Sequence, residues 1–192
     1  MKKTTKQDIR VVKTRAAVRR AFLSLACEKA VTDISIKEIA DEAKINRTTF
    51  YLHYKSVEDI YHDIINEHMA FCEAIIKKHN NELLDFNFAE CAVEFAEYHD
   101  GVFVNAEKLR NSVFMLCMRR KVRDIFRDFI AELYAKPEMK AKFIPLSEAI
   151  LSGIAAGVVS VISNWISSDR RTSLRDSCNE WSFAILNGIK KI

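Results

Sequence analysis

Residues 35–54, SIKEIADEAKINRTTFYLHY, decide the fold of the N-terminal part of this 192-residue chain. Ser35, followed by Glu38 three residues later, forms a capping-box pattern that predicts where a first short helix begins. Its buried face is predicted by apolar residues at helical spacing, which are Ile36, Ile39, Ala40 and Ala43. After a tight connection at Lys44-Ile45, Asn46 is suited to cap a second helix over residues 47–54. Two short helices joined by about three to four residues predict a helix-turn-helix.

The second predicted helix has two faces of different character. Arg47 and Tyr51 lie one turn apart, with Thr48 between them. Phe50 and Tyr54 form another pair one turn apart, rotated away from that face. One face can therefore meet DNA, while the other anchors the helix in a core.

The stretch resembles the TetR family of one-component transcriptional regulators over roughly the first third of the chain. The residues that carry the resemblance are Ile39-Ala40, Ala43, Ile45, Asn46, Thr49-Phe50-Tyr51, His53-Tyr54 and Ser56-Val57-Glu58-Asp59-Ile60. Three positions depart from the family pattern: Lys44 and Thr48 stand where Gly is usual or frequent, and Val57 stands where Lys is usual. A left-handed Lys44 would cost about 1 kcal/mol. Lys55 lies near enough to replace the lysine missing at position 57.

The resemblance implies an all-α protein with two domains. Residues 1–55 would form a three-helix DNA-binding domain, and residues 56–192 a helical domain for effector binding and dimerisation. The implied function is that of a homodimeric repressor, which binds a near-palindromic operator in double-stranded DNA and is released by a small-molecule effector. Four Gly, two Pro and the scarcity of strand patterns independently favour an all-helical chain.

The positive charge is concentrated in the same segment. Residues 1–60 contain 13 Lys and Arg and 8 Asp and Glu. Residues 61–192 contain 17 Lys and Arg and 18 Asp and Glu. A cluster of charged residues more often marks a solvent-exposed face without a partner. Together with the helix-turn-helix pattern, however, this basic excess indicates a surface that faces the phosphates of DNA.

Candidate DNA contacts divide by chemistry, the alternative being a polar helix surface without a partner. Arg47, and Thr48 beside it, can reach base edges in the major groove, with Arg as a bidentate donor to guanine. The side chains better suited to contact phosphate oxygens are those of Thr49, Tyr51, His53 and Lys55. The predicted DNA-binding set also includes Asn46 and, through the resemblance, Lys37.

The remainder of the chain predicts further helices separated by short breaks. A first helix runs from about Arg10 to residues 28–30, and a long one extends from Ser56 to His79. The next break is placed at Asn80-Asn81 with a cap at Asp85. Later helices are expected to end at Asp100-Gly101, to span 112–135, and, after a connector from Pro137 to Pro145, to span 146–167 and 173–187, with Gly188 as the stop.

The resemblance implies an effector site among the aromatic residues in the middle of the chain, although ordinary core packing explains these residues at least as well. The candidate ligand-binding residues are Phe95, Phe114, Met118 and Phe126. The run Arg119-Arg120-Lys121-Arg123 could neutralise an anionic effector, but a solvated helix face is the simpler interpretation.

The family resemblance implies that the last two helices form a dimer interface. Its candidate residues are Gly153, Gly157, Val161, Trp181 and Ile185. The apolar run AILSGIAAGVVSVI, residues 149–162, is shorter than the roughly 20 residues that span a bilayer, so a buried helix is expected and no membrane.

Other classes of function find little support. The chain has no Gly-rich phosphate loop, HExxH or nucleophile elbow, so we expect neither an enzyme nor a cofactor. Its five cysteines form no CxxC or Cys/His cluster, which predicts no metal site and suits a reducing cytoplasm. The charged start MKKTTKQDIR, not followed by an apolar signal core, argues against secretion. An architectural or division factor that binds DNA without sensing a ligand remains the alternative.

Overall fold

A computed structural model describes residues 6–102 and 113–189 of the protein. The elements within these ranges are α-helices and one short 3₁₀ helix, which confirms the all-α prediction. The chain forms two compact units: Met1–His68 with Lys108–Met115, and Met69–Glu107 with Leu116–Ile192.

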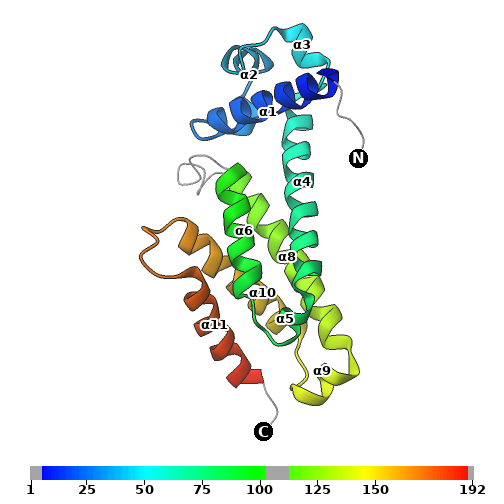
Figure 1. Ribbon diagram of the computed structural model, residues 1–192, viewed down its shortest axis with the longest axis vertical. Coiled ribbons are helices and arrows are strands. Elements are labelled where there is room, and N and C mark those ends of the chain that lie inside the picture. The colour runs from blue at the N-terminus through cyan, green and yellow to red at the C-terminus, as the bar shows by residue number, and fades with distance from the viewer. Residues whose placement is uncertain (1–5, 103–112, 190–192) are drawn as a thin grey trace. The chain divides into compact units, whose positions relative to one another are not determined.

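The first unit contains the predicted helix-turn-helix. Its elements are α1 (Lys6–Ala26), η1 (Val31–Asp33), α2 (Ile36–Glu42), α3 (Arg47–Tyr51) and the beginning of α4 (Val57–Lys78). α1 packs against α2, and α2 packs against α3 (Figure 1). Large side chains that these elements bury fully include Phe22, Ile39, Phe50, Ile60 and Ile64. Helix α1 includes residues from Lys6 onward, earlier than the predicted start near Arg10, and α3 is shorter than predicted.

The connection between α2 and α3 is a Schellman motif. The N–H of Ile45 donates to the carbonyl of Ala40 at 2.9 Å, and the N–H of Lys44 donates to that of Asp41 at 3.2 Å. Lys44 itself has φ 55°, in the left-handed region where glycine is the least strained residue. The motif ends α2 abruptly, so α3 begins only three residues after Lys44.

Replacing Lys44 with glycine is therefore expected to stabilise the first unit by about 1 kcal/mol, since glycine removes the steric strain of a left-handed Cβ. Chemical denaturation of the full chain would measure the change. Lys37→Gly, on the exposed surface of α2, is the matched control and should cost about 1 kcal/mol. Equal effects from the two substitutions would contradict the assignment of strain to position 44.

The second unit is built mainly from α6 (Ala89–Val102), α8 (Val113–Ala135), α10 (Glu148–Ile166) and α11 (Leu174–Ile189), together with the end of α4. Helix α6 lies beside α11, and both pack against α10 (Figure 1). Their core is continuous and apolar and includes Phe88, Phe95, Phe126, Ile154 and Leu174.

Two segments expected to be irregular are short helices instead. Asn80–Leu84 forms α5, with Leu83 buried, and Pro137–Lys142 forms α9, with Met139 buried. Proline is compatible with the first helical turn, where its missing N–H has no intrahelical partner. α5 is therefore separated from α4 by the single residue His79 and from α6 by residues 85–88.

Two predicted helix boundaries are also wrong. The bond that caps α6 comes from Asn87, whose Oδ1 accepts from the N–H of Ala89 at 3.1 Å, while Asp85 is the residue that ends α5. Gly188 lies inside α11 and does not terminate it. The sequence also predicts a short segment around residues 102–110 that leads into the helix over 112–135, and from residue 103 onward it lies outside the described residues.

By length and composition alone, α10 is apolar enough to cross a membrane. One side of the helix, however, is buried against protein. Ile154, Ala155, Val158, Val159 and Ile162 all lie in the core of the second unit, so α10 is buried on this side and not all round.

Candidate nucleic-acid interface

Local hydrogen bonds position α3 as the sequence predicts. Asn46 precedes the helix in an extended conformation, and its Oδ1 accepts from the N–H of Thr49 at 2.7 Å. The capping box of α2 is present in both directions, because Ser35 Oγ accepts from the N–H of Glu38 and the Glu38 carboxylate accepts from the N–H of Ser35. Hydrogen bonds from Lys29 and Ser35 lower the pKa of Glu38 to about 2. Both helices of the motif thus begin at defined residues.

Phe50 and Tyr54 anchor α3. Phe50 is fully buried, with its ring 6.1 Å from that of Tyr54 and 5.6 Å from that of Tyr51. The other side of the helix is open to solvent, where Arg47, Thr48 and Tyr51 are exposed. The structure therefore separates an anchoring face from a free face.

The remaining predicted DNA contacts surround this free face. Lys55, directly before α4, is exposed, and so is Lys37 on α2. Thr49 and His53 are half-buried. The Asn46 side chain is used in the cap, although the residue remains exposed.

A polar network joins the end of the motif to α1 and α4. Arg15 donates to Asp63 at 2.6 Å, and the Tyr54 hydroxyl donates to the same carboxylate at 2.7 Å. The Arg15 guanidinium also lies 5.0 Å from the centre of the Tyr54 ring. Burial alone would raise the pKa of Asp63, but the hydrogen bonds from Tyr54 and Arg15 outweigh it and hold that pKa below its usual value. The pKa of Tyr54 is raised, mainly by burial and then by the hydrogen bond to Asp63, so the hydroxyl stays protonated.

A surface hollow of about 400 Å³ adjoins this network. It brings together three predicted contacts, Tyr51, His53 and Lys55, with residues that the sequence alone did not indicate. These additional residues are Arg15, Leu52, Asp59, His62 and Asn66. A spacing of 48 residues between Arg15 and Asp63 carries no local sequence signal, so only the fold reveals the pair.

The candidate effector residues are divided between the two units. Phe95, Met118 and Phe126 belong to the second unit and are buried there. Phe114 belongs to the first, where its ring lies 6.2 Å from that of Phe22 and 5.6 Å from that of Tyr61. Close packing also accounts for these side chains.

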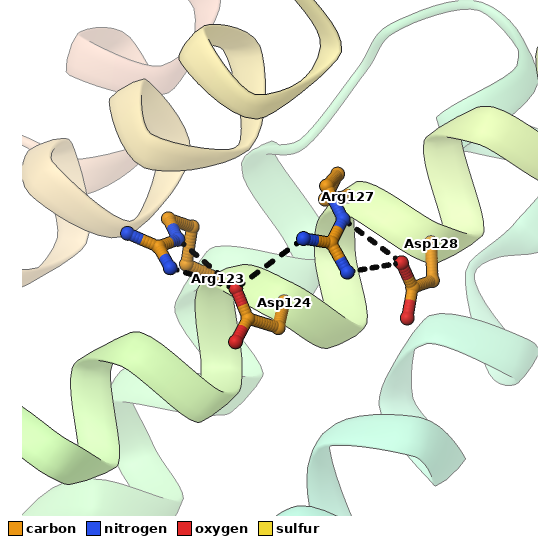
Figure 2. Close-up of polar contacts among 4 residues, drawn as sticks. All are labelled: Arg123, Asp124, Arg127 and Asp128. Carbon is orange, nitrogen blue, oxygen red and sulfur yellow. Dashed lines mark hydrogen bonds and ion pairs between the residues drawn. The ribbon is translucent and has the colours of Figure 1, made fainter. Parts of the chain in front are cut away.

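The basic run on α8 is partly neutralised by acidic residues of the same helix. Figure 2 shows Asp124 between Arg123 and Arg127, and Asp128 beside Arg127. The nitrogen–oxygen distances are 2.8 Å from Arg123 to Asp124, 3.8 Å from Arg127 to Asp124 and 2.7 Å from Arg127 to Asp128. The hydrogen bond from Arg123 lowers the pKa of Asp124. This pattern favours a solvated helix face over an anion site, since Arg123 already has a carboxylate partner.

A second hollow, of about 460 Å³, lies within the second unit between the end of α6 and the connection from α10 to α11. Its wall combines Val93, Trp165 and Leu174 with Arg170 and Arg171. Arg170 donates to both oxygens of Asp100 and stacks over Trp165, which fixes this part of the wall.

The predicted dimer residues lie on α10 and α11 and are only partly free. Val161, Trp181 and Ile185 pack against the core of their own unit. A Cβ added at Gly157 would stand 2.5 Å from the Trp181 ring, whereas Gly153 has open space around it. The close approach at Gly157 therefore joins α10 to α11 within one protomer.

The described part of the chain holds no group of three or more His, Cys, Asp or Glu side chains arranged for a metal ion. Cys72, Cys91 and Cys178 are buried in the second unit, and burial raises the pKa of each thiol.

Comparison with known proteins gives short sequence matches. No protein-family model matches the chain. Over 64 residues it is 39% identical to the uncharacterised helix-turn-helix transcriptional regulator YxbF of Bacillus subtilis, a match covering 33% of this chain and 17% of that protein. Over 53 residues it is 36% identical to an uncharacterised helix-turn-helix transcriptional regulator of Haemophilus influenzae, covering 28% of this chain and 26% of the other. The chain thus matches about a quarter or less of each regulator's length.

Solved structures match over nearly the whole chain at low identity. NalD of Pseudomonas aeruginosa, the secondary repressor of the MexAB-OprM multidrug efflux pump, has a TM-score of 0.65 at 17% identity, with 94% of this chain and 98% of NalD covered. FadR of B. subtilis, solved in complex with stearoyl-CoA, has a TM-score of 0.61 at 17% identity, with 90% of this chain and 97% of FadR covered. A protein of Shewanella sp. PV-4, described as a putative TetR-family transcription regulator, has a TM-score of 0.63 at 15% identity, with 93% of this chain and 99% of that protein covered. The chain therefore has the fold of the TetR family of transcriptional regulators.

Proposed function

We propose that the protein is a sequence-specific DNA-binding transcriptional regulator that acts as a homodimer and is released from its operator by a small molecule. The observation that carries this proposal is the free face of α3, which presents Arg47, Thr48 and Tyr51 while Phe50 is fully buried on the other side. Residues 1–55 act as the DNA-binding domain, and residues 56–192 bind the effector and form the dimer. This role involves no catalysis and no membrane, and its site of action is the cytoplasm.

In the proposed complex α3 enters the major groove. Arg47 and Thr48 read base edges, with the Arg47 guanidinium as a bidentate donor to guanine. Phosphate oxygens accept from the surrounding side chains, which are Lys37, Asn46, Thr49, Tyr51, His53 and Lys55.

Selection of random duplex DNA with the full-length protein tests the proposal. We expect a near-palindromic site whose half-sites are about 10 bp or a multiple apart, because a two-fold dimer presents two recognition helices. Affinity should fall steeply with salt, since phosphate contacts release counterions. Recovery of unrelated sequences with no shared half-site would contradict sequence-specific regulation and favour the architectural alternative.

Two exposed apolar side chains support a dimer formed through α10 and α11. Phe183 on α11 is 69% exposed, and Ile150 on α10 is 44% exposed. Gly153, one turn after Ile150, would let a second helix approach closely. Exposed apolar side chains on two neighbouring helices favour dimerisation, because a second copy of the chain removes them from water.

The effector is proposed to be a small, largely apolar molecule. The support is the aromatic core of the second unit and the fold shared with FadR, whose structure holds stearoyl-CoA. Release requires a ligand that prefers the state unable to bind DNA. Tenfold release needs about 1.4 kcal/mol of such preference, which one or two rearranged aromatic contacts can supply. We propose that Phe95, Met118 and Phe126, which are buried in the second unit, respond to the ligand and that the movement reaches α3 through α4.

Filling the proposed site should separate effector response from DNA binding. A thermal-shift screen of apolar molecules, stearoyl-CoA included, first identifies a binder that releases DNA. Met118→Trp, at a buried position, should then abolish release while operator affinity stays unchanged. Leu116→Trp, exposed on the same helix, is the control and should keep the response. If Met118→Trp still responds, the site lies elsewhere, and the 460 Å³ hollow is the next region to mutate.

A further inference from the structure

Leu52 has the largest exposed fraction, 77%, among the large apolar side chains in the described ranges. It is the residue directly after α3, and its backbone continues the helix, with φ −70°, ψ −18° and an N–H bond to the carbonyl of Thr48 at 3.2 Å. Because so little of this side chain is covered, packing against the described residues does not explain a leucine at this position. A single exposed leucine is common on protein surfaces, so its surroundings must decide whether it matters.

The surroundings place Leu52 on the free face of the recognition helix. Thr48 and Leu52 are four residues apart, so their side chains point to the same side of the turn, and both are exposed. Arg47 and Tyr51 form the adjoining exposed pair. The face therefore offers one cationic donor at its beginning, the methyl group of Thr48 beside it, and the two methyl groups of Leu52 directly after its end.

The chemistry of the major groove gives these methyl groups one matching partner. Base edges in the groove present hydrogen-bond donors and acceptors, and the apolar exception is the C5-methyl group of thymine. The Leu52 side chain has no hydrogen-bond donor, so it cannot bind a phosphate of the DNA backbone. We infer that Leu52 reads the C5-methyl group of a thymine in each operator half-site, beside the base read by Arg47. The inference rests on the proposed DNA-binding function and adds a specificity-determining residue to it.

Deoxyuridine tests the inference directly, because it lacks only the thymine methyl group. Each thymine of the selected half-site is replaced in turn, symmetrically in both half-sites, and dissociation constants are measured by fluorescence anisotropy. At one position the wild type should bind the deoxyuridine operator more weakly, by about fourfold for each methyl group removed. Leu52→Ala should bind thymine and deoxyuridine equally at that position, whereas Leu52→Met should retain part of the difference.

Two further variants separate Leu52 from other causes. Thr48→Ser removes a methyl group and keeps the hydroxyl, so it reports whether Thr48 also touches the thymine methyl. Leu116→Ala, an exposed leucine on α8, should leave the thymine preference unchanged. Circular dichroism should show that all variants fold, since these side chains are exposed or conservatively changed.

The outcomes distinguish this inference from the proposed function. Specific binding with no sensitivity to any thymine methyl, or an undiminished preference in Leu52→Ala, would overturn the inference and leave the regulator intact. Failure of the wild type to enrich any DNA sequence would overturn both.

Discussion

Phe183→Glu should convert the protein into monomers and lower its affinity for a complete operator by about 10²–10⁴-fold. A dimer that holds one half-site places its second recognition helix at high local concentration near the other, and a monomer loses that advantage. The substitution puts a charge where we propose that two copies bury an aromatic ring, and an unpaired buried charge is strongly unfavourable. The protomer should tolerate the change, because Phe183 is 69% exposed within it.

Sedimentation equilibrium would measure the mass, and anisotropy the affinity for one-half-site and two-half-site duplexes. Leu116→Glu places the same charge at an exposed apolar position outside α10 and α11 and should stay dimeric. Gly153→Leu is a second probe of the interface: it favours the helix but blocks close approach of another copy. Gly157 is a poor probe, because a larger residue there meets Trp181 of the same chain. A dimer that survives both Phe183→Glu and Gly153→Leu would show that the interface lies elsewhere.

The helix-turn-helix could be predicted because its signals are local. Ser35, Asn46 and Lys44 each act through bonds to residues within five positions, and the structure contains all of these bonds. The same locality explains why the anchoring of Phe50 could be predicted from helical spacing alone. Short-range chemistry therefore determines the part of the chain that presents the proposed DNA contacts.

Predictions failed where packing outweighed local preference. Asn80-Asn81 and Pro137 looked like breaks, yet burial of Leu83 and Met139 accompanies a short helix at each. The contact of Arg15 with Asp63 joins residues 48 positions apart, which no spacing rule predicts. The close approach of Trp181 to Gly157 also depends on packing between two helices of the fold, and the place of Gly157 in a dimer interface stays a prediction.

Arg47→Ala should weaken operator binding by about 1–3 kcal/mol and should relax the preference at a single base position. Arg47 is the first residue of α3 and is exposed on the face that also carries Thr48 and Tyr51. A bidentate contact with guanine depends on which base is present, so its loss should matter most for the best operator and least for variants already lacking that guanine.

Tyr51→Phe supplies the contrast on the same face of the same helix. Its hydroxyl is proposed to donate to a phosphate, a group identical at every base pair, so its removal should weaken all operators by a similar factor. The two variants are compared on the selected operator and on single-base changes across one half-site, at two salt concentrations. Because each removes a group from an exposed side chain, neither should alter the core around Phe50. Base-independent losses for both variants would contradict the assigned roles and place the reading of bases on Thr48 and Leu52 alone.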